Sequence, residues 1–266
     1  KLTRDKRELG LSDDDMKRFD QMLAHPHGII LVTGPTGSGK STTLYTALSE
    51  LNRETVNIVT VEDPVEANID GVNQIQVNPK ADMTFASALR SILRQDPDII
   101  MIGEIRDPET AEIAVQASIT GHLVASTLHT NSTSASIARL LNMGIEPYLM
   151  ADALVGVVAQ RLVRKLCRCK RGREATAQEK EELGVNQDEV LTIYEPAGCQ
   201  LCSQTGYFGR TAVYEMMPVT PELRWAITKM QPSSKVKEIA QREGMITLRG
   251  SAVRLVREGV TSLEEN

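Results

Sequence analysis

The chain has 266 residues, of which 41% are hydrophobic and 24% charged, a balance typical of one or two globular domains. Its net charge of −5 and its 3% of aromatic residues disfavour nucleic acid as the main partner, because such binding uses basic surfaces and stacking side chains. No apolar run reaches the roughly 18–20 residues of a membrane-spanning helix, and the polar first residues are unlike a signal peptide, so we expect a cytoplasmic protein.

The first part of the chain predicts alternating helices and strands. An entry helix over residues 12–25 has Ser12 as its N-cap, and further helices begin at Ser41, at Asp107 and after a cap at Asn131. Strands are expected at residues 28–33, 56–61, 98–102 and 122–127, with an edge strand at 72–77. This alternation predicts an α/β fold with a mostly parallel sheet, covered on both faces, whose ligands bind at the carboxyl ends of the strands.

The second part of the chain predicts smaller and mostly helical structure. A charged helix at 175–183 and short strands at 191–194 and 211–214 precede helices from 221 to 260, in which Trp225 is expected to face a core. We divide the chain into the tail of a preceding domain or linker with the entry helix (1–27), a core (28–164), a cysteine-rich subdomain (165–214) and a helical region (215–266).

One glycine-rich segment lies between a predicted strand and a predicted helix. Its sequence, Gly-Pro-Thr-Gly-Ser-Gly-Lys-Ser, fits the phosphate-binding loop, whose glycines let backbone N–H groups turn toward phosphate oxygens. In such loops the lysine reaches the β- and γ-phosphates, and the serine hydroxyl binds the Mg²⁺ that bridges them. An ordinary strand-to-helix turn is the alternative. We predict an ATP site, with Ser41 as Mg²⁺ ligand, formed by Gly34, Pro35, Thr36, Gly37, Ser38, Gly39, Lys40, Ser41 and Thr42.

Charged residues follow the predicted strands. Glu62, Asp63 and Glu66 follow the second strand, and Glu104 and Arg106 follow the third. An ATPase needs a carboxylate that orients water, acids near Mg²⁺ and cations on the γ-phosphate, and this set offers each of them. A charge directly after a buried strand is costly unless it is paired or used, which favours a functional Glu104. An exposed acidic loop is the alternative for residues 62–66.

Two further features concern the same edge of the predicted sheet. The fourth strand begins at His122 and is followed by His129, and both are either site residues or hydrogen-bonded core histidines. Gly103 stands where many phosphate-loop ATPases have a Mg²⁺-binding Asp, so Ser41 and water would hold the ion here, with help from Glu62 or Asp63.

The four cysteines fall in two close pairs, Cys167 with Cys169 and Cys199 with Cys202. In a protein expected in the reducing cytoplasm, such pairs indicate a metal rather than disulfides, and four thiolates suit a tetrahedral structural Zn²⁺. Free thiols are the alternative. Because so small an insert can hardly bury a core of its own, a metal would supply the missing stability.

Basic residues gather around the first cysteine pair. They form either a solvated helix face that runs into a polar loop or a contact for anionic lipid or an acidic partner. They are Arg161, Arg164, Lys165, Arg168, Lys170, Arg171 and Arg173.

From about residue 10 to 266, the motifs together resemble the ATPases of type II secretion and type IV pilus extension. They are the phosphate loop, the acidic box at 60–66, the long run Leu-Arg-Gln-Asp-Pro-Asp-Ile-Ile-Met-Ile-Gly-Glu-Ile-Arg-Asp at 93–107 and the histidine box at 120–131. The resemblance implies a RecA-like P-loop ATPase domain with a tetracysteine zinc-binding insert and a C-terminal helical region. The family has two residues between the cysteines of each pair, whereas Cys167 and Cys169 have one between them.

The resemblance also implies roles for individual residues, with Glu104 as the catalytic carboxylate. Glu62 and Asp63 would assist the metal and the water, and His122 and His129 would sense the γ-phosphate. Arg106 is the remaining predicted site residue. The implied protein is a homohexamer in full-length form, peripheral to the inner membrane, that acts on an inner-membrane platform protein to assemble pilin or pseudopilin filaments, without nucleic acid as a partner.

Several expectations remain open at this point. The family has a domain before the phosphate-loop domain that supplies arginines to the nucleotide. We expect this chain to be part of a longer protein, to lack that domain, to bind nucleotide and to hydrolyse ATP weakly. The alternatives are a DNA-transfer or other nucleic-acid motor, a nucleotide-dependent switch, and a zinc-dependent docking module with a vestigial ATPase.

Overall fold

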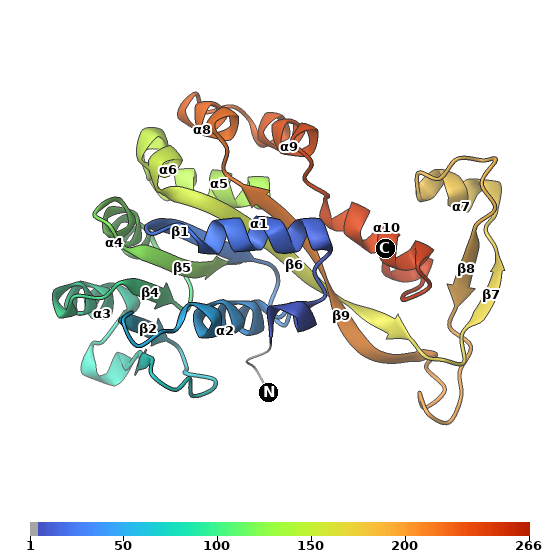
Figure 1. Ribbon diagram of the computed structural model, residues 1–266, viewed down its shortest axis with the longest axis horizontal. Coiled ribbons are helices and arrows are strands. Elements are labelled where there is room, and N and C mark those ends of the chain that lie inside the picture. Colours follow the sequence, from blue (N-terminus) through green and yellow to red (C-terminus); the bar gives the residue numbers. More distant parts are fainter. Residues whose placement is uncertain (1–4) are drawn as a thin grey trace. The chain divides into compact units, whose positions relative to one another are not determined.

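The computed structural model describes residues 5–266 and contains one large sheet of seven strands (Figure 1). The strand order is β3-β2-β4-β5-β1-β6-β9, and the pairs among β1 to β5, together with the β1–β6 pair, are parallel. The predicted α/β fold and the edge position of β3 are confirmed. The strands are β1 Gly28–Thr33, β2 Ile58–Glu62, β3 Asn73–Gln76, β4 Ile99–Ile102, β5 Leu123–Leu128, β6 Leu154–Leu166 and β9 Tyr207–Pro218.

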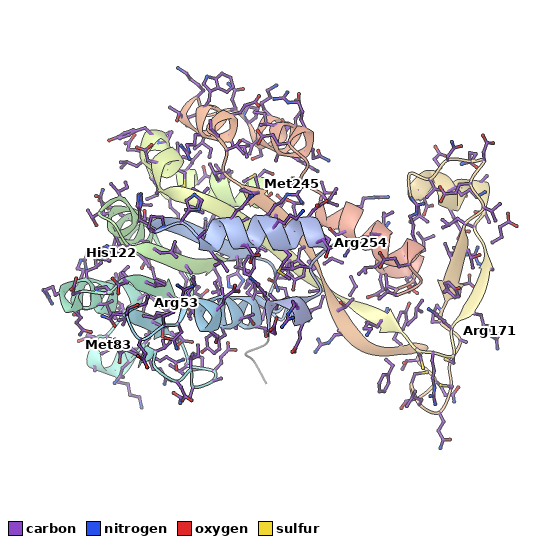
Figure 2. The ribbon with its side chains drawn as sticks, in the orientation of Figure 1. Arg53, Met83, His122, Arg171, Met245 and Arg254 are labelled. Carbon is purple, nitrogen blue, oxygen red and sulfur yellow. The ribbon has the colours of Figure 1, made fainter. Side chains whose placement is uncertain are left out.

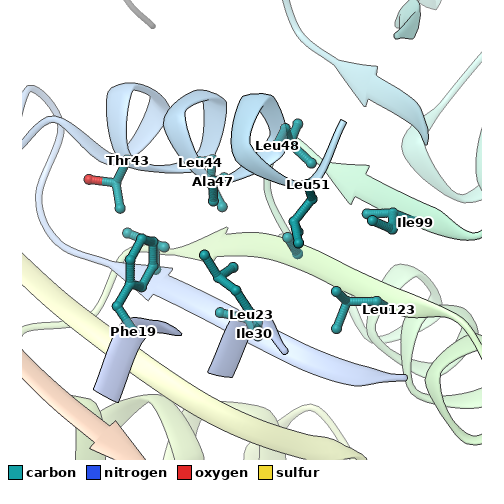
Figure 3. A pocket seen from close by; sticks show the side chains of 12 residues that line it. Phe19, Leu23, Ile30, Thr43, Leu44, Ala47, Leu48, Leu51, Ile99 and Leu123 are labelled. Carbon is teal, nitrogen blue, oxygen red and sulfur yellow. The ribbon is translucent and has the colours of Figure 1, made fainter. Parts of the chain in front are cut away.

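Helices cover both faces of this sheet because successive strand side chains point to opposite sides. Ile30 and Val32 of β1 meet α1 and α2, in an apolar pocket (Figure 3). Ile29 and Leu31 join the main core with residues of the remaining helices. The helices that cover the sheet are α1 Asp13–Leu23, α2 Lys40–Leu51, α3 Phe85–Ile92, α4 Pro108–Ile119, α5 Thr133–Asn142, α6 Pro147–Ala153, α8 Pro221–Thr228 and α9 Ser233–Arg242. Short 3₁₀ turns lie at Lys6–Leu9, Pro79–Ala81 and Leu93–Gln95.

The helix starts show which sequence signals were sufficient. The Ser12 hydroxyl accepts a hydrogen bond from the N–H of Asp15, and the Asp107 carboxylate accepts one from Thr110, so both predicted caps are confirmed. The N-cap of α5 is Ser132 and not Asn131, because the Ser132 hydroxyl accepts a hydrogen bond from the N–H of Ala135.

Strand β6 was not predicted. Its first seven residues are all buried, so the alternation that marks a strand is absent from that part of the sequence. Arg161, Arg164 and Lys165 lie on its second half, and Arg171 and Arg173 lie on strand β7 (Arg171–Glu174). The interpretation of this basic segment as a helix face is therefore wrong.

The described residues fall into two compact units. Unit 1 comprises the described chain up to Gln160 together with Glu215–Met245, and unit 2 comprises Arg161–Tyr214 with Ile246–Asn266. The chain passes between the units within β6 and within β9. The helices after residue 220 are thus divided, α8 and α9 to unit 1 and α10 to unit 2. Trp225 on α8 is 50% exposed, which contradicts the expectation that it faces a core.

Unit 2 has a small core of its own. Strand β7 pairs antiparallel with β8 (Thr192–Glu195), and α7 covers Ala177–Glu182. Val256 of α10 (Leu248–Arg257) packs with Leu191 and Ile193, so a helix from the end of the chain completes the core that the insert could not form alone. A 3₁₀ turn, Leu263–Glu265, follows. Within residues 5–266, no helix combines the length and apolar character needed to cross a bilayer.

Candidate functional site

The carboxyl ends of four neighbouring strands bring the predicted polar residues to one edge of the sheet. Lys40 begins α2 shortly after β1, Glu62 ends β2, Glu104 follows β4, and His129 follows β5. These strands run parallel in the order β2-β4-β5-β1, so the segments that leave their carboxyl ends all emerge on the same side. Such an edge is where open parallel sheets bind ligands.

The glycine-rich loop has the compact shape that its sequence predicts. Gly37 and Gly39 have φ angles of 81° and 91°, which favour glycine. At Gly34 an added Cβ atom would lie only 2.4 Å from the carbonyl oxygen of Gln160, so no side chain fits. The hydroxyl of Ser38 is buried in this loop and has no hydrogen-bond partner within the described structure. A buried hydroxyl without a partner in a glycine-rich turn fits a loop built for an anionic ligand.

A chain of polar contacts links the loop to the residues after β4 and β5. Lys40 Nζ donates to the carbonyl oxygen of Gly34 at 2.6 Å and to Nδ1 of His129 at 3.1 Å. His129 Nε2 donates to Glu104 at 3.1 Å, and Arg106 forms an ion pair with the same carboxylate. Because Nδ1 accepts and Nε2 donates, this geometry assigns His129 the Nε2–H tautomer. Glu104 is thus held between two donors.

The pKa values of these groups follow from their neighbours. Burial lowers the pKa of the Lys40 amine, while the charge of Glu104 acts in the opposite direction. Burial alone would raise the pKa of Glu104, but the hydrogen bond and charge of Arg106, followed by those of His129, outweigh it and lower the pKa. The same pairing raises the pKa of Arg106. Glu104 is therefore a carboxylate at neutral pH.

Glu62 lies deeper than expected for a metal ligand. Its side chain is buried and accepts hydrogen bonds from the hydroxyls of Tyr45 and Thr60 and, at 3.2 Å, from the amide of Gln74. The pKa of Tyr45 is raised to about 12, mainly by burial and secondly by the hydrogen bond to Glu62. The structure therefore makes Glu62 an internal anchor of the loop that follows β2.

The loop after β2 presents two other acids toward the site. Asp63 lies 3.5 Å from Arg106, and Glu66 accepts a hydrogen bond from the Ser41 hydroxyl at 3.1 Å. The N–H of Glu66 donates to the Tyr45 hydroxyl, and Ser41 and Tyr45 are neighbours on one face of α2. Glu66 is thus the acid that contacts the predicted Mg²⁺ ligand, a role that the sequence analysis did not assign.

The structure does not bring His122 to this cluster. It precedes β5, and the register pairs its neighbour Leu123 with Gly28 at the start of β1, the opposite end from the phosphate loop. Its Nδ1 lies 2.9 Å from the carbonyl oxygen of Ala117 in α4, and Figure 2 labels it beside that helix. Within this chain His122 is a histidine tied to the fold, because residues before a parallel strand lie at its amino edge.

The shift of the acid from position 103 to 104 has a steric reason. A Cβ atom on Gly103 would lie 3.3 Å from the Cα of Glu62 and 3.5 Å from the ring of Phe85. Such contacts leave little room for a carboxylate side chain at 103. Glu104, one residue further, instead lies beside Arg106, whose guanidinium also stacks over Phe85.

The four cysteines converge in unit 2 despite the single residue between Cys167 and Cys169. All four Sγ atoms lie within 4.8 Å of one another, with separations of 3.7 Å for Cys167–Cys199 and Cys199–Cys202, and 3.9 Å for Cys169–Cys202. Tetrahedral Zn²⁺ with bonds of about 2.3 Å places its sulfur ligands about 3.8 Å apart. The separations fit a tetrathiolate metal site and exceed a disulfide bond.

Two backbone amides donate hydrogen bonds to the sulfur of Cys202. The N–H groups of Cys199 and Gly206 each donate to Cys202 Sγ at 3.2 Å. Burial alone would raise the pKa of Cys202, but these amide donors, together with hydrogen bonds from the thiols of Cys199 and Cys169, lower it to about 6. Thiolate is the form that binds metals, so this arrangement favours a cation at the centre of the cluster.

The basic segment beside the cysteines is partly neutralised within unit 2. Arg164 pairs with Glu265 and stacks over Tyr207, and Arg173 pairs with Glu179 and Glu195. These contacts give two of its members structural roles.

Fold and site together define a RecA-like α/β protein whose glycine-rich loop between β1 and α2 has the pattern of a phosphate-binding loop. A profile of the family described as type II/IV secretion system protein matches residues 1–266. The chain therefore belongs to the type II/IV secretion system protein family.

Relatives agree with this assignment. The chain is 52% identical to type II secretion system protein E of Pseudomonas aeruginosa over 258 residues, which cover 97% of the chain and 51% of the relative. It is 51% identical to type II secretion system ATPase E of Vibrio cholerae over 262 residues, 98% of the chain and 52% of the relative. Type IV pilus assembly ATPase PilB of Thermus thermophilus is 48% identical over 97% of the chain and 29% of the relative. The chain thus spans about half the length of the type II secretion relatives.

Solved structures share the fold. The pilus retraction motor PilT with bound ADP aligns over 99% of this chain and 66% of its own, with a TM-score of 0.74 and 30% identity. The Legionella pneumophila ATPase DotB aligns with a TM-score of 0.72 and 22% identity over 99% of this chain and 64% of its own. These likenesses confirm the predicted RecA-like fold.

Proposed function

We propose that this chain is the motor portion of an ATPase that binds and hydrolyses ATP to drive assembly of pseudopilin or pilin filaments. The observation that carries the proposal is the linked set of Lys40, His129, Glu104 and Arg106 at the mouth of the phosphate loop. It unites cations for phosphate oxygens with a carboxylate for water, the parts that phosphoryl transfer needs. Filament assembly as the process is supported by the names of two relatives, a type II secretion system ATPase and a type IV pilus assembly ATPase.

In the proposed site ATP takes over contacts that the protein now makes with itself. Lys40, which now donates to the carbonyl of Gly34, would bind phosphate oxygens, and Ser41, which now donates to Glu66, would bind Mg²⁺. Glu66 and Asp63 are the acids that would assist the metal there. Glu104 orients the attacking water, and because its pKa is lowered, it is a weak base whose main task is orientation.

For the cysteine cluster we propose a structural Zn²⁺ bound by Cys167, Cys169, Cys199 and Cys202. The separations of the sulfur atoms and the amide donors to Cys202 support this choice. Metal analysis of the purified chain tests it, with one equivalent expected in the wild type and less than a tenth in Cys199→Ser.

The larger assembly is part of the same proposal. We propose that the full-length protein is a homohexamer on the cytoplasmic side of the inner membrane, where it acts on a platform protein. A longer protein that carries Glu104→Gln should bind ATP yet fail to assemble filaments in cells. Filament assembly at the wild-type level by this variant would favour a nucleotide switch over a motor.

A further inference from the structure

Gln160 is a buried polar side chain at the phosphate loop to which the proposed function assigns no role. It is 1% exposed and is the last residue of unit 1 on β6. Its amide nitrogen donates to the carbonyl oxygen of Ser38 at 2.8 Å, and its amide oxygen accepts from the Thr43 hydroxyl at 2.6 Å. Both ends of the amide are therefore engaged, one by the loop and one by the first turn of α2.

The bond to Ser38 fixes the direction of one peptide group in the loop. In a trans peptide the carbonyl and the following N–H point in opposite directions. Because Gln160 holds the Ser38 carbonyl toward itself, the N–H of Gly39 is turned to the other side. Phosphate-binding loops bind anions through backbone N–H groups turned inward, so the direction of this peptide matters for affinity.

Two other contacts bring Gln160 close to both ends of the loop. Its own carbonyl oxygen lies 2.4 Å from the position that a Cβ atom on Gly34 would take, so the first residue of the loop packs against the Gln160 backbone. Thr43, held by the amide oxygen, is the residue whose N–H makes an early hydrogen bond of α2, to the Gly39 carbonyl at 3.1 Å. One side chain thus ties the loop to the start of its helix.

We propose that Gln160 is a positioning residue that keeps the phosphate loop in its nucleotide-binding conformation. It acts through Ser38 and Thr43 and does not touch the nucleotide. This inference rests on the proposed function, since it assumes that the loop binds ATP. Without Gln160 the loop populates other conformations, and the measured affinity falls in proportion to the fraction that is competent.

Three variants test this inference on the present chain. Gln160→Met keeps the size and removes both hydrogen bonds, whereas Gln160→Glu keeps the acceptor for Thr43 but, when charged, has no donor for Ser38. Ser126→Ala is the matched control, because it removes another buried hydrogen bond to a backbone carbonyl, at Ile102 on β4. The measurement is titration with a fluorescent ATP analogue in the presence of Mg²⁺, together with thermal unfolding.

The expected result is a loss of ATP affinity of about tenfold in both Gln160 variants, which corresponds to a competent fraction of about one tenth. The control should stay within about twofold of the wild type. In Gln160→Glu the ratio of its Kd to that of the wild type should fall toward one as the pH is lowered, because the neutral carboxyl carries an O–H that can donate to Ser38. A purely structural role predicts no such rescue.

The two possible failures are distinguishable. If the wild-type chain does not bind ATP, the proposed function is wrong. If the wild-type chain binds ATP and both Gln160 variants bind ATP as tightly as the wild type does, the role assigned to Gln160 is wrong. Should Gln160→Met fail to fold, hydrogen exchange decides. The amides of residues 34 and 36–40 must exchange faster in nucleotide-free Gln160→Glu than in the wild type, and equal rates contradict the inference.

Discussion

The hydroxyl of Tyr45 offers a test of how the acidic loop is held. Tyr45→Phe removes one of the three donors to the buried carboxylate of Glu62 and leaves the ring in place. A hydrogen bond to a charged group contributes about 1.5–3 kcal/mol. The N–H of Glu66 also loses its acceptor, but that residue is exposed, so water replaces the bond at little cost. We expect a loss of about 2 kcal/mol in the free energy of unfolding.

The assay is urea denaturation followed by the far-UV signal, with wild type and variant compared at equal slopes. Tyr148→Phe is the matched control, since the Tyr148 side chain is 58% exposed, and its effect should stay within about 0.5 kcal/mol. Combining Tyr45→Phe with Glu62→Gln completes a double-mutant cycle, which should show a coupling of about 1 kcal/mol or more. A loss below about 0.5 kcal/mol for Tyr45→Phe would refute the anchoring role of Glu62.

Three other predictions concern the site and the cysteine cluster. Because Arg106 and His129 lower the pKa of Glu104, hydrolysis should persist into mildly acidic solution and fall only as the pH drops through that lowered pKa. In Arg106→Met this fall in the rate of hydrolysis should occur at a higher pH. A fall at the same pH as in the wild type would contradict the pairing of Arg106 with Glu104. His129→Ala should weaken ATP binding while His122→Ala leaves it unchanged, so equal effects in a binding titration would refute the placement at opposite ends of β5. Removal of metal by a chelator should speed hydrogen exchange of residues 167–206 and leave exchange in α2 unaffected. Equal exchange rates of residues 167–206 before and after chelation would rule out a structural metal.

The sequence was sufficient where a local signal coincides with a local structure. The phosphate loop, the caps at Ser12 and Asp107 and the core strands follow from short patterns of glycine, capping residues and apolar runs. The rule that ligands bind at the carboxyl ends of parallel strands then predicted that Glu104 and His129 meet near Lys40.

The remaining features depend on contacts between residues far apart in the chain. Gln160 gives no sequence signal, because its partners lie more than a hundred residues earlier and β6 shows no alternation there. The burial of Glu62 depends on Tyr45 and Gln74, which a strand pattern cannot reveal. His122 was predicted as a site residue because its box resembles that of the family, and the register places it at the amino end of β5, away from His129.

The most direct test of the account is single-turnover hydrolysis of MgATP by the wild-type chain and by Glu104→Gln, with ATP binding measured in the same samples. The account predicts equal affinity and a rate of hydrolysis about 10²–10⁴-fold lower in the variant, because the carboxylate that orients water is lost. Hydrolysis by Glu104→Gln at the wild-type rate would contradict it.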